Sequence, residues 1–146
     1  MKKISVLLLA VLTLGLTMVS CTKDDVQASV EGKWSYDSAT GTVNGVAIGD
    51  IPGGYIGQVN TPGCTKNTIE LKTGGVIEGL TYAGTNCTVT KGAGTWTKDG
   101  DNLSFVINGE TQNYTIESVT DTTLKIKTTQ TISGSVITLT ATFIKA

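Results

Sequence analysis

The sequence predicts an all-β protein, an eight-stranded up-and-down antiparallel barrel. Three short turn signals, Asp99-Gly100, Asn108-Gly109 and Ser133-Gly134, each lie between segments in which apolar and polar residues alternate. Such dipeptides supply the positive φ angles that two-residue hairpin turns require. Thr, Val, Ile and aromatic residues fill the segments between the turns, and the mature part of the chain shows no helical periodicity.

The three turns also predict the registers of the hairpins. A slip of one residue would move each apolar side chain to the other face of the sheet, beside Thr and Ser. Counting outward from the turns, the expected partners are Trp96 with Leu103, Gly94 with Phe105, Phe105 with Gln112, Leu103 with Tyr114, Leu124 with Phe143, and Ile126 with Ala141.

Residues 1–20 have the pattern of a secretion signal. Lys2 and Lys3 precede an apolar run from Ile4 to Val19, which is slightly shorter than the roughly 20 residues of a membrane-spanning helix. The run ends at Met18-Val19-Ser20-Cys21, which resembles the lipobox of bacterial lipoproteins, with Met18 in place of the usual leucine. This resemblance implies that Cys21 is lipidated and becomes the new N-terminus. The alternative is an ordinary cleaved signal followed by an incidental cysteine.

The residues behind Cys21 form a polar tether over residues 21–31. Cys21-Thr22-Lys23-Asp24-Asp25 resembles the surface-export signal of lipoproteins in one large Gram-negative phylum. The resemblance implies an outer-membrane lipoprotein that is exposed on the cell surface and whose partner is the membrane. The periplasmic face of the outer membrane remains the alternative location, since a solvated tether fits both.

Composition excludes several classes of function. The chain has 146 residues, 11 basic and 12 acidic residues and a net charge of −1, and no basic patch is readable, so nucleic acid is not an expected partner. It contains no histidine and no arginine. Histidine-based catalytic triads and histidine-containing zinc sites are therefore excluded. We expect no cofactor, no metal and no catalytic residue.

Eight strands are expected within one domain of residues 32–146. Their predicted ranges are 33–38, 67–72, 76–82, 92–98, 102–107, 111–119, 123–132 and 136–145. The last strand would pair with the first to close the barrel. An eight-stranded barrel leaves room for packed side chains or for one small ligand.

Two cysteines remain once Cys21 is lipidated. Cys64 precedes the second strand and Cys87 lies between the third and fourth, so alternating strand directions place both at the same end of the barrel. In an oxidising compartment this even pair predicts a disulfide, which contributes about 3 kcal/mol in the chain-entropy model. Two free buried thiols are the alternative.

The first strand carries Gly32-Lys33-Trp34, and Gly94-Thr95-Trp96 repeats the pattern on a later strand. The first tripeptide resembles the Gly-x-Trp that opens lipocalins. Together with the lipoprotein start, one long first loop and short later hairpins, it resembles the lipocalin-like domain of bacterial surface lipoproteins over residues 32–146. Lipocalins proper pack an arginine across the first tryptophan, and this chain has none, so their ligand classes are not carried over.

The cysteine end is the expected mouth of the barrel, with residues 41–62 as a lid. Trp34 and Trp96 fall at the opposite end and are interpreted as a structural plug, the alternative being a ligand role. The candidate ligand-binding residues are Tyr55 in the lid and Tyr82, Phe105, Glu110, Gln112, Tyr114, Gln130 and Ile137 on the inward face near the mouth. In the alternative, the polar groups sit in water over a solid core.

Two acidic motifs are weak evidence for a calcium site and for a hydrolytic site. Residues 99–102 could suggest calcium but lack the further ligands of a binding loop, and they fit a hairpin turn. Nothing in the sequence places Glu70 and Glu78 at a working separation in a cleft. We therefore expect a non-enzymatic binder of a small, mainly apolar molecule. The alternative is a surface module with a filled barrel that interacts with protein or glycan.

Overall fold

The computed structural model describes residues 28–50 and 60–146, which form nine strands and contain no helix, and so no helix able to cross a membrane. The strands are β1 (Gly32–Val43), β2 (Val46–Asp50), β3 (Thr68–Lys72), β4 (Val76–Ala83), β5 (Thr88–Asp99), β6 (Asn102–Ile107), β7 (Glu110–Val119), β8 (Thr123–Ile132) and β9 (Ser135–Lys145).

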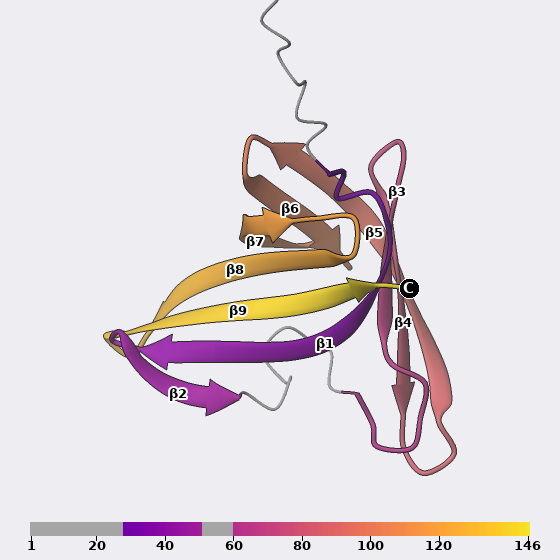
Figure 1. Cartoon of the computed structure of the whole chain (residues 1–146), viewed down its shortest axis with the longest axis horizontal. Coiled ribbons are helices and arrows are strands. Elements are labelled where there is room, and N and C mark those ends of the chain that lie inside the picture. The colour runs from indigo at the N-terminus through magenta and orange to yellow at the C-terminus, as the bar shows by residue number, and fades with distance from the viewer. Residues whose placement is uncertain (1–27, 51–59) are drawn as a thin grey trace, which may run out of the picture.

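The strands form a closed antiparallel barrel (Figure 1). From β3 to β9 each strand pairs with the next one in sequence, and β1 pairs with both β3 and β9. Eight strands, β1 and β3 to β9, therefore complete the circle, and β2 is an additional strand beside β1. The predicted up-and-down barrel and its closure by the first and last strands are confirmed.

The prediction that a lid begins at residue 41 is wrong. β1 was predicted to end at residue 38, but it continues to Val43 and pairs with β9 along this extension. A turn at Asn44-Gly45 with positive φ at both residues then leads into β2. The Asn44 backbone N–H donates to the Val136 carbonyl oxygen (2.8 Å), and the Val136 N–H donates to Asn44 Oδ1 (2.9 Å). Residues 51–59 of the expected lid lie outside the described residues.

Two of the three predicted hairpin registers are confirmed, those around Asn108-Gly109 and Ser133-Gly134. The first is wrong by two residues, because the turn is formed by residues 100–101 and Asp99 pairs with Asn102. Trp96 consequently lies opposite Phe105 rather than Leu103. A shift of two residues leaves every side chain on its predicted face, so the residues predicted to face the core still do so.

The core fills one end of the barrel around Trp34, which is 0% exposed. Its indole N–H donates to the Val30 carbonyl oxygen (2.8 Å), and Lys145 Nζ lies 4.2 Å from the ring centroid. The other core residues are Val30, Tyr36, Ala39, Ile69, Leu71, Ile77, Leu103, Phe105, Tyr114, Ile116, Leu124, Ile126, Ala141 and Phe143, and Trp96 is half-buried against them. A lysine on the last strand thus takes the cation position over the first tryptophan in a chain without arginine.

The two ends of the barrel differ in how fully the strands pair. The closed end contains the turns at residues 73–75, 100–101 and 120–122 and both described termini. At the open end, residues 88–93 of β5 pair only with β4, and residues 128–132 of β8 pair only with β9. Figure 1 shows β3, β4 and β5 diverging there from β8, β9, β1 and β2.

Gly94 is required where β5 passes close to β6. A Cβ built at this residue would overlap the Val106 carbonyl oxygen and approach the Ile107 Cα to 3.2 Å. We therefore expect Gly94→Ala to lower the free energy of unfolding by about 1 to 3 kcal/mol, the usual range for overpacking. Gly92→Ala is the matched control, because a Cβ there meets nothing within 4 Å. Urea unfolding of both variants measures the difference, and equal stability would show that the strands can separate without cost.

Candidate ligand site at the open end of the barrel

An inner hollow of about 280 Å³ lies where β5 parts from β6. Apolar side chains of Ile69, Ile77 and Ile107 line it, with two threonine hydroxyls and one amide among them. Its remaining lining residues are Gly79, Thr81, Thr90, Lys91, Gly92, Ala93 and Asn108. An apolar surface with a few polar groups is the usual composition of a small-molecule site, and the volume is near the lower end for such sites.

Part of the wall of this hollow is backbone without side chains, because Gly79 and Gly92 lie directly opposite each other in β4 and β5. Both share the face of buried Ile77, so side chains at these positions would project into the hollow. Neither needs to be glycine for the fold: a Cβ at Gly92 meets nothing within 4 Å, and one at Gly79 makes only ordinary contacts of 3.8 and 4.0 Å. Glycine within a strand costs about 0.5 to 1 kcal/mol relative to alanine and often marks close approach of a ligand.

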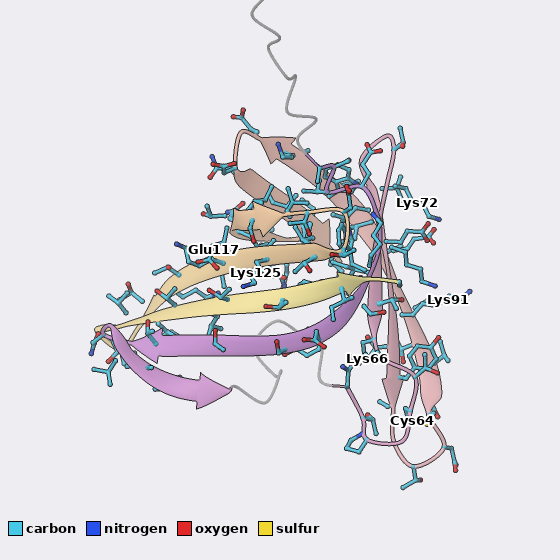
Figure 2. The ribbon with its side chains drawn as sticks, viewed as in Figure 1. Cys64, Lys66, Lys72, Lys91, Glu117 and Lys125 are labelled. Carbon is cyan, nitrogen blue, oxygen red and sulfur yellow. A yellow bond between two sulfur atoms is a disulfide. The ribbon has the colours of Figure 1, made fainter. Side chains whose placement is uncertain are left out.

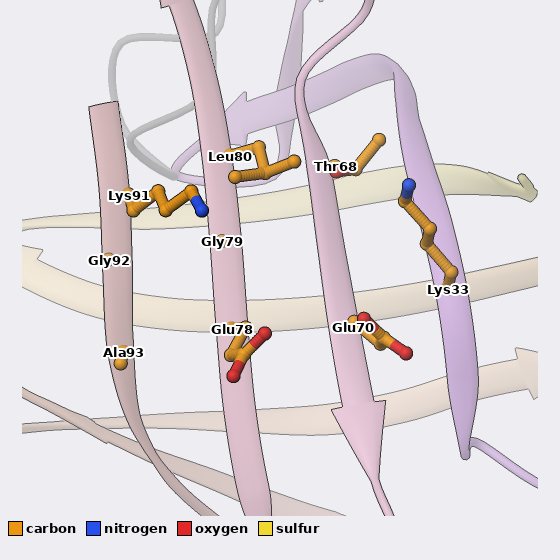
Figure 3. Close-up of a pocket in the computed structure, with 9 residues that line it drawn as sticks. All are labelled: Lys33, Thr68, Glu70, Glu78, Gly79, Leu80, Lys91, Gly92 and Ala93. Atoms are coloured by element: carbon orange, nitrogen blue, oxygen red, sulfur yellow. The ribbon is translucent and has the colours of Figure 1, made fainter. Parts of the chain in front are cut away.

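The outer face of the same strands carries a second hollow of about 280 Å³ (Figure 3). Lys33, Glu70 and Glu78 form one row across β1, β3 and β4. Lys72 Nζ lies 2.7 Å from Glu78 Oε2, and the hydrogen bond and charge of this lysine lower the pKa of the Glu78 carboxyl. A general acid needs a raised pKa, so Glu78 is poorly suited to that role.

Three of the predicted ligand residues come together between β6 and β7. The rings of Phe105 and Tyr114 have centroids 5.1 Å apart, and the Tyr114 hydroxyl donates to Gln112 Oε1 (2.7 Å). Gln112, Tyr114 and Gln130 line a third hollow of about 290 Å³ between β7 and β8.

The other predicted ligand residues lie apart from this group. Ile137 pairs with Gln130 on the neighbouring strand. Glu110 is exposed beside the β6–β7 turn. Tyr55 lies outside the described residues. Tyr82 was expected on the inward face, and this is wrong, because buried Ile77 sets the inward face of β4 and Tyr82, an odd number of residues away, faces outward.

The disulfide between Cys64 and Cys87 is confirmed, with Cα atoms 5.4 Å apart. It joins the segment before β3, where Figure 2 labels Cys64, to the β4–β5 turn at the open end. The fully buried Asn67 strengthens the same connection: its carbonyl oxygen accepts from the Tyr36 N–H (2.9 Å) and its Oδ1 accepts from the Tyr82 N–H (2.7 Å). The rim is therefore tied to β1 and β4 beside the inner hollow.

Sequence reasoning missed most of the inner hollow because it searched for side chains. The glycines, Thr81, Thr90, Ile107 and Asn108 did not enter the list of candidates. A usable signal was present, since glycine at two interior strand positions is unfavourable unless something approaches the backbone. Reading the β4–β5 register would have placed the two glycines opposite each other.

The described residues contain no group of three or more Cys, Asp or Glu side chains that could hold a metal ion. A closed antiparallel barrel with an apolar hollow at its open end belongs to the class of binding folds. Residues 30–126 match the family model described as lipocalin-like domain, and the chain therefore belongs to the lipocalin-like domain family. This fold is generally a non-enzymatic binding fold, which fits the geometry of the open end.

Two solved structures share the fold at low sequence identity. A lipocalin-like protein from Bacteroides uniformis has a TM-score of 0.50 and 10% identity, over 80% of this chain and 97% of that chain. An uncharacterized protein from Bacteroides eggerthii has a TM-score of 0.52 and 9% identity, over 81% of this chain and 100% of that chain. No curated protein matches the chain.

Burial raises the pKa of Tyr114 from 10.0 to about 12. The unfolded phenol ionises first, so the free energy of unfolding should fall as pH rises through this interval. We expect the absorbance at 295 nm that Tyr114→Phe removes from the wild-type titration to appear near pH 12. A difference between the two curves centred near pH 10 would show that Tyr114 is not shielded from water.

Proposed function

We propose that the barrel binds a small, uncharged, mainly apolar molecule in the inner hollow. The observation that carries this proposal is the Gly79 and Gly92 pair, which keeps the hollow open although the fold gains nothing from it. Three isoleucine side chains offer apolar contact, and Thr90 and Asn108 offer the few hydrogen bonds that would orient a ligand. The disulfide and Asn67 fix the neighbouring rim.

We further propose that the protein is an outer-membrane lipoprotein anchored through Cys21 and exposed on the cell surface. Ala28, Ser29 and Val30 lie beside Trp96 at the closed end. The chain from Cys21 to Ala28 reaches at most about 25 Å when extended. An anchor at Cys21 would hold the closed end near the membrane and turn the open end away from it, where a ligand can enter.

A second role, in protein contact, is favoured by exposed apolar side chains at the open end. Val46, Ile48, Ile132 and Val136 are each at least 40% exposed, and all four lie on β2 or beside the β8–β9 turn. Apolar residues gathered at one end of a molecule are typical of an interaction surface. This surface lies on different strands from the inner hollow, so the two roles are compatible.

Filling the inner hollow tests the binding proposal. We expect Gly92→Leu to abolish saturable binding of the neutral fluorophore N-phenyl-1-naphthylamine to a soluble form spanning Thr22 to Ala146. Thr95→Leu is the matched control, because Thr95 lies one residue beyond Gly94 on β5 and points to the outer face. Fluorescence titration measures the dissociation constants. Equal binding by the wild type and Gly92→Leu would contradict the assignment of the hollow.

Removing the lipid attachment site tests the anchor. We expect Cys21→Ala to eliminate incorporation of labelled palmitate and to shift the protein out of the outer-membrane fraction. In intact cells, protease should remove the wild-type barrel from the surface. Protection from protease until the outer membrane is opened would instead place the anchored protein on the periplasmic face.

A further inference from the structure

The third hollow, between β7 and β8, lies where the edges of two strands separate. β7 pairs with β8 only from Thr115 onward, whereas its residues 110–115 pair with β6 on the other side. Residues 128–132 of β8 pair with β9 and with no other strand among the described residues. Both edges of the hollow therefore carry backbone N–H and C=O groups that no strand pairing uses.

Every side chain that lines this hollow is polar and uncharged. The lining residues are Thr111, Gln112, Asn113, Tyr114, Thr128, Thr129 and Gln130. The charged side chains of the two strands lie elsewhere: Glu110 is the first residue of β7, and Glu117 and Lys125, labelled in Figure 2, lie where the strands pair. Lys127 lines only the adjoining hollow of about 240 Å³. Because a charged ligand would meet no opposite charge in the third hollow, this lining favours a neutral ligand.

Two amide side chains of β7 are held in fixed orientations at this hollow. The Tyr114 hydroxyl donates to Gln112 Oε1 (2.7 Å), and the Ser104 hydroxyl donates to Asn113 Oδ1. Tyr114 is 7% exposed, so its hydroxyl would lose its hydrogen bond if Gln112 turned away. Since both amide oxygens already accept a hydrogen bond, each amide presents its NH₂ group as a donor, and neither NH₂ group has a partner among the described residues.

The wall formed by β8 offers acceptors as well as donors. The side chains of Thr128 and Gln130 make no hydrogen bond with the described residues, whereas the Thr129 hydroxyl lies 3.1 Å from that of Thr138. A hydroxyl and an amide can each donate and accept. The hollow, of about 290 Å³, therefore suits an uncharged molecule with several groups that both donate and accept hydrogen bonds.

We propose that the third hollow binds a neutral sugar unit of a glycan. Sugar hydroxyls on adjacent carbons can accept from the NH₂ groups of Gln112 and Asn113 and can exchange hydrogen bonds with Thr128 and Gln130 on the facing wall. The unpaired backbone groups of the two edges are further partners. This site goes beyond the proposed binding of an apolar molecule and does not depend on it, because the β6–β7 hairpin lies between the third hollow and the strands β3 to β5 that line most of the inner hollow.

An extended peptide is the other occupant that unpaired strand edges could hold. An added strand obtains its specificity from pockets that receive alternate side chains. The third hollow has no aliphatic lining residue, so it offers the apolar side chains of a peptide no such pocket. The amides and hydroxyls of the lining match a sugar better than they match a strand.

Saturation-transfer difference NMR tests the site, with the full chain in a detergent that has no sugar headgroup. The probes are maltotriose, cellotriose and chitotriose, which are neutral and differ in linkage or in an acetamido group. We expect at least one probe to give a saturable signal with the unsubstituted chain. Thr128→Val combined with Gln130→Met should weaken its binding by about ten-fold, because each lost hydrogen bond changes affinity by about two- to ten-fold.

Two variants serve as controls and should bind the sugar like the unsubstituted chain. Thr131→Val makes the same chemical change as Thr128→Val on the same strand, but Thr131 does not line the hollow. Gly92→Leu fills the inner hollow and leaves the third hollow unchanged. The second control separates this site from the proposed site for an apolar ligand, so either can fail alone.

Each other outcome overturns the proposal. Absence of a signal from all three sugars, or equal binding with and without the two β8 substitutions, shows that the third hollow holds no sugar. Loss of binding in Gly92→Leu places the sugar in the inner hollow instead. A peptide of alternating threonine and glutamine that binds where the sugars do not, and that the β8 substitutions release, shows an inserted strand. Thermal unfolding of each variant verifies that the barrel is intact.

Discussion

Pairing of β1 with β9 over the buried Trp34 is the constraint on which the rest of the structure depends. The two strands pair from Trp34 to Val43, and this contact turns an open sheet into a barrel. Trp34 has three contacts: its indole N–H donates to the Val30 carbonyl oxygen, Lys145 lies over its ring, and Ile69 is its partner on β3. The first and last strands of the domain form this pair, so closure of the barrel brings the start and the end of the domain into one core.

The barrel opens where its packed core ends. Large apolar side chains fill the barrel as far as Phe105, Tyr114 and Leu139, and beyond them the inward positions are mostly Gly, Thr and Gln. Small and polar residues cannot hold opposite strands together by packing, so β5 parts from β6 and β8 parts from β7. Stability therefore resides at the closed end, which leaves the open end available for binding.

Much of the fold could be predicted because local turn chemistry and alternation agree. Asn108-Gly109 and Ser133-Gly134 each fix a register by themselves. The predicted turn at Asp99-Gly100 was displaced by one residue, which shifts the strand register by two, since an Asp-Gly-Asp-Asn sequence offers two adjacent turn positions and only tertiary packing chooses between them. β2 lies within the segment predicted to be a lid, because a glycine and exposed apolar residues are less typical of a strand than of a loop.

The site was less predictable than the fold. The group of Phe105, Gln112 and Tyr114 followed from register alone, but Tyr82 was assigned to the wrong face because an aromatic residue was assumed to point inward. The inner hollow depends on absent side chains at Gly79 and Gly92, which a search for functional groups passes over. Its shape also needs the separation of β5 from β6, a long-range feature that no local pattern encodes.

A direct measurement of cargo decides whether the barrel is a container. The protein would be purified from its own host without denaturation and examined by native mass spectrometry, then again after unfolding. A reproducible small added mass on the folded protein, released on unfolding and extractable into organic solvent, is the predicted result. A bare mass in the folded state, unchanged after exposure to host extract, would contradict ligand binding in the hollow.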